Sequence, residues 1–237
     1  MFLSLSVLWI TVAVAQVKKK QVIQLDISKL LNARPVSVLN NKKIITWTTG
    51  VDGHGAADGY LTNSAALFNG DKNAHALPDN ALIPANKTHP EIKLHYSNND
   101  AKNNQACSLK SEGDFFFDVP SDKFKEIYLA LTSAEGSTRL RVALNYVDGT
   151  EVKVFIVPDY YQDIAPNNPD FCYLLHDLAK WGPKNNMTEK YNHNIDLLKI
   201  KPDPERVLKS IRISKTRPAY LVFWGATAVK TYQIYKV

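Results

Sequence analysis

Cysteine is scarce in this chain, with only two among 237 residues. Two thiols exclude a disulfide-dense miniprotein and a zinc site built from four cysteines. The 29 basic and 23 acidic residues leave a net charge of +6, and 45% of the residues are hydrophobic. This ordinary composition excludes disordered and fibrous architectures. We expect one folded domain over residues 16–237.

Familiar catalytic motifs are also missing. The chain contains no Gly-x-Ser-x-Gly elbow and no His-Glu-x-x-His motif, and its six histidines lack metal-ligand spacing. A pair of carboxylates for glycoside hydrolysis cannot be selected among 23 acidic residues without geometry. These absences favour a non-catalytic protein.

Long apolar runs are missing except at the N-terminus. Residues 1–15 carry no charge, and their apolar stretch ends in the small-residue pattern Ala13-Val14-Ala15, which is typical of a secretory signal. A signal anchor is the alternative, but crossing roughly 30 Å of hydrocarbon takes about 20 residues. We therefore predict a signal peptide over residues 1–15 and a secreted, extracellular protein without a membrane span.

Two further features agree with export. Asn86 and Asn186 each begin an N-glycosylation sequon. In an oxidising compartment, Cys107 and Cys172 are predicted to form one disulfide, which would stabilise the fold by about 4 kcal/mol on the chain-entropy model. Two separate buried cysteines are the alternative.

Alternation of apolar and polar residues recurs along the chain and predicts about ten short strands. The pair Asp148-Gly149 lies between two alternating runs and suits a tight hairpin turn. Helical periodicity is weak, at residues 28–32, 65–68 and 174–181, and no segment suits a βαβ crossover. We predict an all-β fold, an antiparallel β-sandwich of jelly-roll type.

Two long irregular stretches, residues 50–88 and 158–194, interrupt the predicted strands. Loops of this length are usually functional. In the second stretch Tyr160, Tyr161 and Trp181 are candidates for stacking on sugar rings, and Asp159 and Asp163 for bonding hydroxyls. Placement of these aromatics in the core is the alternative.

The glycine-rich segment 52–59 offers a candidate Ca²⁺ site. Asp52 and Asp58 would supply hard oxygen ligands, and the glycines would permit the bend. A plain surface turn is the alternative.

Basic residues concentrate late in the chain and suggest a strip that faces an acidic polysaccharide. They are Lys199, Lys201, Arg206, Lys209, Arg212, Lys215 and Arg217. A solvated sheet face is the alternative. Nucleic acid is not expected as a partner, because the strip lacks interleaved aromatic residues.

Several short segments together resemble galactose-binding-like β-sandwich domains of secreted proteins, over roughly residues 21–229. These are Leu77-Pro78-Asp79-Asn80, Ile83-Pro84-Ala85-Asn86, His89-Pro90-Glu91-Ile92-Lys93-Leu94, Thr132-Ser133-Ala134-Glu135-Gly136, Tyr146-Val147-Asp148-Gly149-Thr150, Val157-Pro158-Asp159-Tyr160-Tyr161 and Phe223-Trp224-Gly225-Ala226-Thr227. The resemblance implies carbohydrate binding through end loops, often with a structural Ca²⁺, and no catalysis. The chain departs from domains of this kind that are appended to glycoside hydrolases, because no catalytic domain accompanies it.

The leading hypothesis is a secreted, lectin-like protein whose partner is an extracellular glycan or polysaccharide. One alternative is a jelly-roll polysaccharide lyase, in which a tyrosine or histidine removes a proton while basic residues neutralise a uronate. Another is an extracellular structural or protein-binding matrix component.

Overall fold

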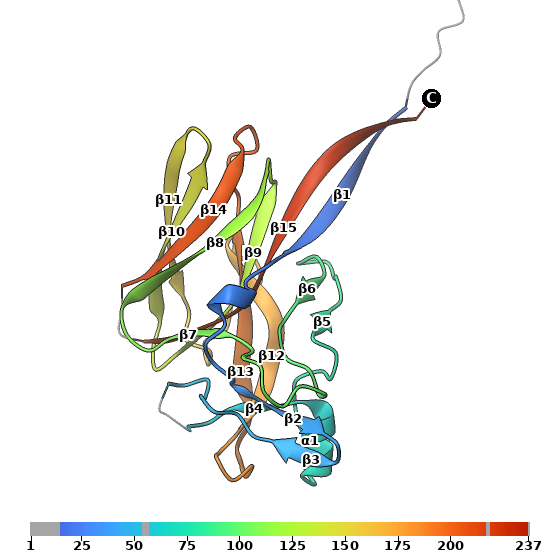
Figure 1. Ribbon diagram of the computed structural model, residues 1–237, viewed down its shortest axis with the longest axis vertical. Coiled ribbons are helices and arrows are strands. Elements are labelled where there is room, and N and C mark those ends of the chain that lie inside the picture. Colours follow the sequence, from blue (N-terminus) through green and yellow to red (C-terminus); the bar gives the residue numbers. More distant parts are fainter. Residues whose placement is uncertain (1–14, 54–56, 217–218, 237) are drawn as a thin grey trace, which may run out of the picture.

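The computed structural model describes residues 15–53, 57–216 and 219–236 (Figure 1). The predicted signal peptide lies outside these residues except for Ala15. Helix in the described part is limited to η1 (Ser28–Leu30) and α1 (Asn63–Phe68), which confirms two of the three short helical predictions.

Strands make up most of the described chain. The first eight are β1 (Ala15–Leu25), β2 (Val36–Asn40), β3 (Lys43–Ile45), β4 (Tyr60–Leu61), β5 (Leu82–Ile83), β6 (Ile92–Lys93), β7 (Cys107–Leu109) and β8 (Gly113–Asp122). The others are β9 (Glu126–Ala134), β10 (Thr138–Tyr146), β11 (Gly149–Val157), β12 (Phe171–Trp181), β13 (Met187–Ile200), β14 (Leu208–Lys215) and β15 (Tyr220–Lys236).

Two antiparallel sheets form the sandwich. The larger has the order β1-β15-β9-β13-β12, with β7 also paired to β15, and the smaller has the order β11-β10-β14-β8. The alternation of apolar and polar residues explains how the smaller sheet buries one face. On β10, Leu140, Val142 and Leu144 enter the core between the sheets, whereas Arg139 and Arg141 face solvent. The predicted all-β antiparallel sandwich is confirmed.

The β10–β11 hairpin turns at Val147 and Asp148, one residue before the predicted Asp148-Gly149 pair, and Gly149 begins β11 opposite Tyr146. Gly149 has a φ of +141°, a backbone conformation that residues with a side chain rarely adopt. The turn therefore explains why glycine occupies this position.

A third layer covers the opposite face of the larger sheet. Apolar side chains of residues 33–106 pack there against β15 and β13, with Tyr60 stacked on Trp224. The small sheets β3-β2-β4 and β5-β6 belong to this layer. Because β9 is covered on both faces, residues 127–134 are all buried and mostly apolar instead of alternating.

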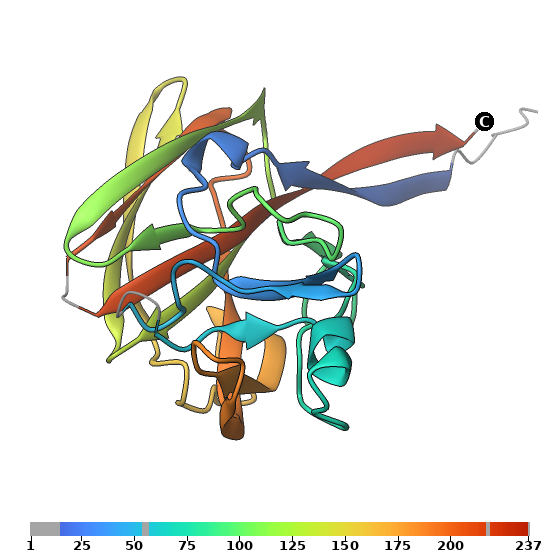
Figure 2. The same ribbon diagram turned by 60° about the horizontal axis from the view of Figure 1, so that its bottom comes forward.

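The strands β1 and β15 extend beyond the body of the sandwich as a two-stranded ribbon (Figures 1 and 2). Their ladder runs from Ala15 opposite Lys236 to Leu25 opposite Ala226. The two ends of the described chain therefore lie side by side.

The predicted loop at residues 158–194 is largely wrong, as is the helical turn at 174–181. Most of this region forms the hairpin of β12 and β13. Repeated register shifts, together with positive φ values at Asp177 and Asn192, break the period-two pattern by which a strand is recognised.

The predicted disulfide is also wrong, because Cys107 and Cys172 are both free thiols. Cys107 lies on β7 and Cys172 on β12, with β15, β9 and β13 between them. Four interstrand spacings separate their Cα atoms by roughly 19 Å, whereas a disulfide requires less than about 7 Å. Cys107 also belongs to the core between the sheets, whereas Cys172 packs on the other face.

Candidate functional site

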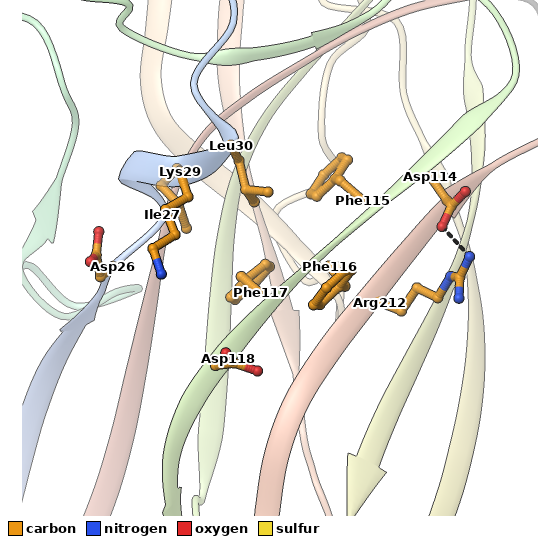
Figure 3. Close-up of a pocket in the computed structure, with 10 residues that line it drawn as sticks. All are labelled: Asp26, Ile27, Lys29, Leu30, Asp114, Phe115, Phe116, Phe117, Asp118 and Arg212. Carbon is orange, nitrogen blue, oxygen red and sulfur yellow. Dashed lines mark ion pairs between the residues drawn. The ribbon is translucent and has the colours of Figure 1, made fainter.

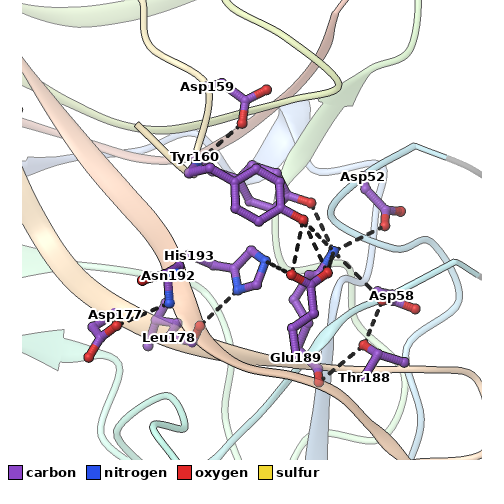
Figure 4. Close-up of polar contacts among 12 residues, drawn as sticks. Asp52, Asp58, Asp159, Tyr160, Asp177, Leu178, Thr188, Glu189, Asn192 and His193 are labelled. Atoms are coloured by element: carbon purple, nitrogen blue, oxygen red, sulfur yellow. Dashed lines mark hydrogen bonds and ion pairs between the residues drawn. The ribbon is translucent and has the colours of Figure 1, made fainter. Parts of the chain in front are cut away.

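A buried lysine gathers residues from several parts of the chain (Figure 4). Lys180 lies on β12, directly opposite Glu189 of β13, and only 5% of its side chain is exposed. The segment after β11 and the loop before β4 complete the surroundings of the ammonium. The surrounding residues are Asp52, Asp58, Tyr160, Tyr161 and Glu189.

The ammonium of Lys180 uses all its donors within this cluster. Its Nζ atom lies 3.0 Å from the Tyr160 hydroxyl, 3.3 Å from the Tyr161 hydroxyl and 3.0 Å from Glu189 Oε1. An ammonium has three N–H donors, so none is left for a ligand. Burial disfavours the charge, but the hydrogen bond to Glu189 raises the pKa of Lys180.

Asp52 and Asp58 lie around one common centre, as the predicted Ca²⁺ site requires, but that centre is the ammonium of Lys180. Their Oδ2 atoms lie 3.9 Å and 3.7 Å from Lys180 Nζ, and Asp58 also accepts a hydrogen bond from Thr188. Burial raises the pKa of Asp52. Within the described ranges no group of three or more His, Cys, Asp or Glu residues is arranged to hold a metal ion. The geometry does not support the predicted Ca²⁺ site.

His193 packs beneath the two tyrosines. Its Nδ1–H donates to the carbonyl oxygen of Leu178 at 2.9 Å, and its Nε2 lies 3.5 Å from Glu189. The Tyr161 hydroxyl donates to the same carboxylate at 3.1 Å. Burial lowers the pKa of His193 and so favours the neutral ring. The cluster is a hydrogen-bonded network that ties the loop before β4 to the β12–β13 hairpin through Thr188 and Asp58, although the Nε2 of His193 and the Oδ1 of Asp52 have no hydrogen-bond partner among the described residues.

The predicted stacking residues are mostly covered. Tyr160 and Trp181 are fully buried, and the Trp181 indole N–H donates to Asp71 at 2.8 Å. Their rings present no face to solvent, so the predicted stacking role of these two residues is wrong. Tyr161 is 45% exposed and can meet a ligand.

The two aspartates predicted to bond sugar hydroxyls have different surroundings. Asp159 accepts hydrogen bonds from the backbone N–H groups of Gly136 and Tyr161, which fix the turn before Tyr160. Asp163 is exposed and accepts one hydrogen bond from Tyr173 at 3.3 Å. Asp159 therefore has a structural role, whereas Asp163 is accessible and contacts Tyr173, which was not among the predicted stacking residues.

A groove with a volume of about 720 Å³ lies apart from the Lys180 cluster and shares no residue with it (Figure 3). It runs beside β8, between that strand and the segment that leads from β1 into η1. The lining residues are Asp26, Ile27, Lys29, Leu30, Asp114, Phe115, Phe116, Phe117, Asp118 and Arg212.

The alternation of β8 explains the aromatic part of this groove. Phe115 and Phe117 enter the core and stack on Phe223, so the residue between them must face outward. Phe116 is therefore 61% exposed. Three consecutive phenylalanines in a predicted strand indicate that one ring faces outward, so alternation alone could have predicted the exposed Phe116.

Charged side chains line the same groove as the Phe116 ring (Figure 3). Arg212 forms an ion pair with Asp114, and Asp26 accepts a hydrogen bond from the N–H of Ser28 at 2.9 Å. The side chains of Lys29 and Asp118 make no hydrogen bond or ion pair with other described residues. The groove thus combines open space, an exposed ring and polar groups that are free to bind a ligand.

The late basic residues do not form one strip. Lys215 is buried and donates to the carbonyl oxygen of Ser111, whereas Arg206 pairs with Asp148 in the β10–β11 turn. Arg217 lies outside the described residues. Of the basic residues in this set that the structure describes, Arg212 alone lines the groove.

Both sequon asparagines, Asn86 and Asn186, are exposed, and their glycosylation stays a prediction. In the described part of the chain, no helix has the length and apolarity needed to cross a membrane.

No protein-family model matches this chain, and a comparison with curated proteins finds no relative. The resemblance to galactose-binding-like domains therefore stays a prediction, and the function has to be argued from the geometry.

Proposed function

We propose that this protein is a secreted, non-catalytic carbohydrate-binding protein and that sugar binds in the groove beside β8. The observation that carries the proposal is Phe116, an exposed ring that lines an open groove between charged side chains. The apolar face of a sugar ring stacks on an aromatic ring, while its hydroxyls need hydrogen-bonding partners nearby. Asp118 and Lys29 are such partners.

The groove suits this role better than the Lys180 cluster does. A ligand needs space and hydrogen-bonding groups that are not already occupied. The donors of Lys180 are used by Tyr160, Tyr161 and Glu189, and its ammonium is buried. The groove supplies both requirements, which supports a proposed binding site on the sheet instead of in the predicted loops.

The same cluster also argues against the lyase alternative. In that mechanism a basic residue neutralises the uronate carboxylate. Here the ammonium of Lys180 already faces the carboxyl groups of Asp52, Asp58 and Glu189. An incoming uronate would therefore meet acidic groups at this cluster, so we expect no cleavage of uronic-acid polymers there.

The experiment compares wild type with Phe116→Ala on a glycan array, followed by calorimetric titration of the best ligand. Burying a phenylalanine side chain contributes about 2 kcal/mol, so Phe116→Ala is expected to weaken binding by roughly 30-fold. Phe68→Ala is the matched control, because Phe68 is an exposed phenylalanine on α1, away from the groove.

Both variants are expected to keep the wild-type melting temperature, since each removes an exposed side chain. Equal affinity of Phe116→Ala and wild type would place the site elsewhere. A blank array, measured both with calcium and with EDTA, would overturn the proposed function.

A further inference from the structure

The outer face of the four-stranded sheet continues from the groove and carries arginines from two strands. Arg212 of β14 lies opposite Phe116 of β8 on one side and opposite Ala143 of β10 on the other. Arg141 and Arg139 precede Ala143 by two and four residues, so they lie on the same face. A row of guanidinium groups therefore leads away from the Phe116 ring.

These arginines differ in how they are paired. Arg212 forms an ion pair with Asp114 at the rim of the groove. Arg139 and Arg141 are exposed, and neither has an acidic side chain of the described residues within 4.0 Å. Their charges are therefore available to an external anion.

The neighbouring edge strand does not neutralise them either. Arg141 lies opposite Val154 of β11, and Arg139 lies opposite Ile156. Cross-strand neighbours often pair opposite charges, but here both neighbours are exposed aliphatic side chains. The arrangement leaves two cations beside an apolar strip, which contributes little to folding and offers contacts to a partner.

We propose that the carbohydrate is an anionic polysaccharide that runs from the groove across Arg212 to Arg141 and Arg139. This inference rests on the proposed function and adds the chemical class of the ligand. Strand spacing and residue rise separate the Cα atoms of Arg212 and Arg141 by roughly 8 Å, and those of Arg141 and Arg139 by roughly 7 Å. The planar guanidinium binds a carboxylate or a sulfate in a bidentate manner, so regularly spaced arginines suit a chain with repeated anionic groups.

The test uses the double variant Arg139→Gln with Arg141→Gln. The double variant Lys42→Gln with Lys43→Gln is its control, because it removes the same charge from exposed positions at β3 and the turn before it, outside the four-stranded sheet (Figure 1). Each protein is titrated with a uronic-acid polymer, a sulfated polysaccharide, a neutral polysaccharide and single-stranded DNA, at low and moderate salt.

We expect wild type to bind one of the two anionic polysaccharides at least 10-fold more tightly than the neutral one. The arginine variant should lose at least 10-fold of that affinity and part of its salt dependence, whereas the lysine control keeps both. The preferred polymer identifies carboxylate or sulfate as the recognised group.

Three results would overturn the inference. Equal losses in the arginine and lysine variants would show that only net charge matters. Equally tight binding of DNA through the same arginines would show general attraction to polyanions. Phe116-dependent binding of the neutral polymer, unaffected by the arginine changes, would refute the anionic ligand while leaving the proposed function intact. If no polysaccharide binds, the proposed function itself fails.

Discussion

The carboxyl group of Asp196 makes the stability of this fold depend on pH in an unusual direction. Asp196 lies on β13 with no exposed surface, and neither of its carboxyl oxygens has a hydrogen-bond partner among the described residues. Burial raises its pKa from 3.8 to about 8. The folded protein therefore holds this group in its neutral form at pH 7, whereas the unfolded chain ionises it near pH 4.

The size of the effect follows from proton linkage. A raised folded-state pKa contributes stability that is complete below about pH 4 and is lost as the pH rises towards 8. Between pH 5 and pH 7 unfolding releases about one proton from this group. The slope of about 1.4 kcal/mol per pH unit predicts a loss of about 3 kcal/mol over this interval.

The assay is urea denaturation of wild type and Asp196→Asn at pH 5, 6 and 7. The asparagine does not titrate. The contributions of all other titratable groups to the free energy of unfolding cancel in the difference between the two proteins. The stability of wild type relative to the variant should fall by about 3 kcal/mol from pH 5 to pH 7. Asp196→Leu should be more stable than wild type at pH 7, because it removes the buried polar group. A difference that does not change with pH would refute the reasoning.

Two further predictions follow from the structure. Lys180→Met leaves Asp52, Asp58 and Glu189 without their cation and should destabilise the protein by about 3 kcal/mol in urea denaturation; a loss below about 1 kcal/mol would show that Lys180 does not neutralise these carboxylates in the fold. Both thiols should react with a thiol reagent in denaturant without prior reduction. In the folded state Cys107 should react slowly, because burial raises its pKa to about 11. Thiols that react only after reduction would contradict the finding that both cysteines are free.

Strands with one face to solvent could be predicted from the sequence, whereas irregular ones could not. On β10 the alternation of Leu140 and Val142 with Arg139 and Arg141 reports directly which face is buried. On β12 the pattern fails, because a bulge at Asp177 and the buried Lys180 disturb it. A buried lysine within a strand can be predicted only when the carboxylate that neutralises it, here Glu189, is known to lie opposite.

The Lys180 cluster likewise could be predicted only in part from the sequence. Tyr160, Tyr161, Asp52 and Asp58 were predicted as functional residues and do meet, but the lysine at their centre was not foreseen. That lysine is brought to them by the hairpin of β12 and β13, which no short-range pattern reveals. The outward position of Phe116, by contrast, depends only on strand parity.

The central claim is that ligand binds beside β8 and not at the Lys180 cluster. The most direct measurement is a titration of the isotope-labelled protein with the preferred polysaccharide, followed by backbone amide chemical shifts. We expect the largest changes at Lys29, Phe116, Asp118 and Arg212, with little change at Tyr161 and Glu189. Chemical-shift changes centred on Tyr161 and Glu189 would contradict this account, because they would show that the ligand binds at the Lys180 cluster.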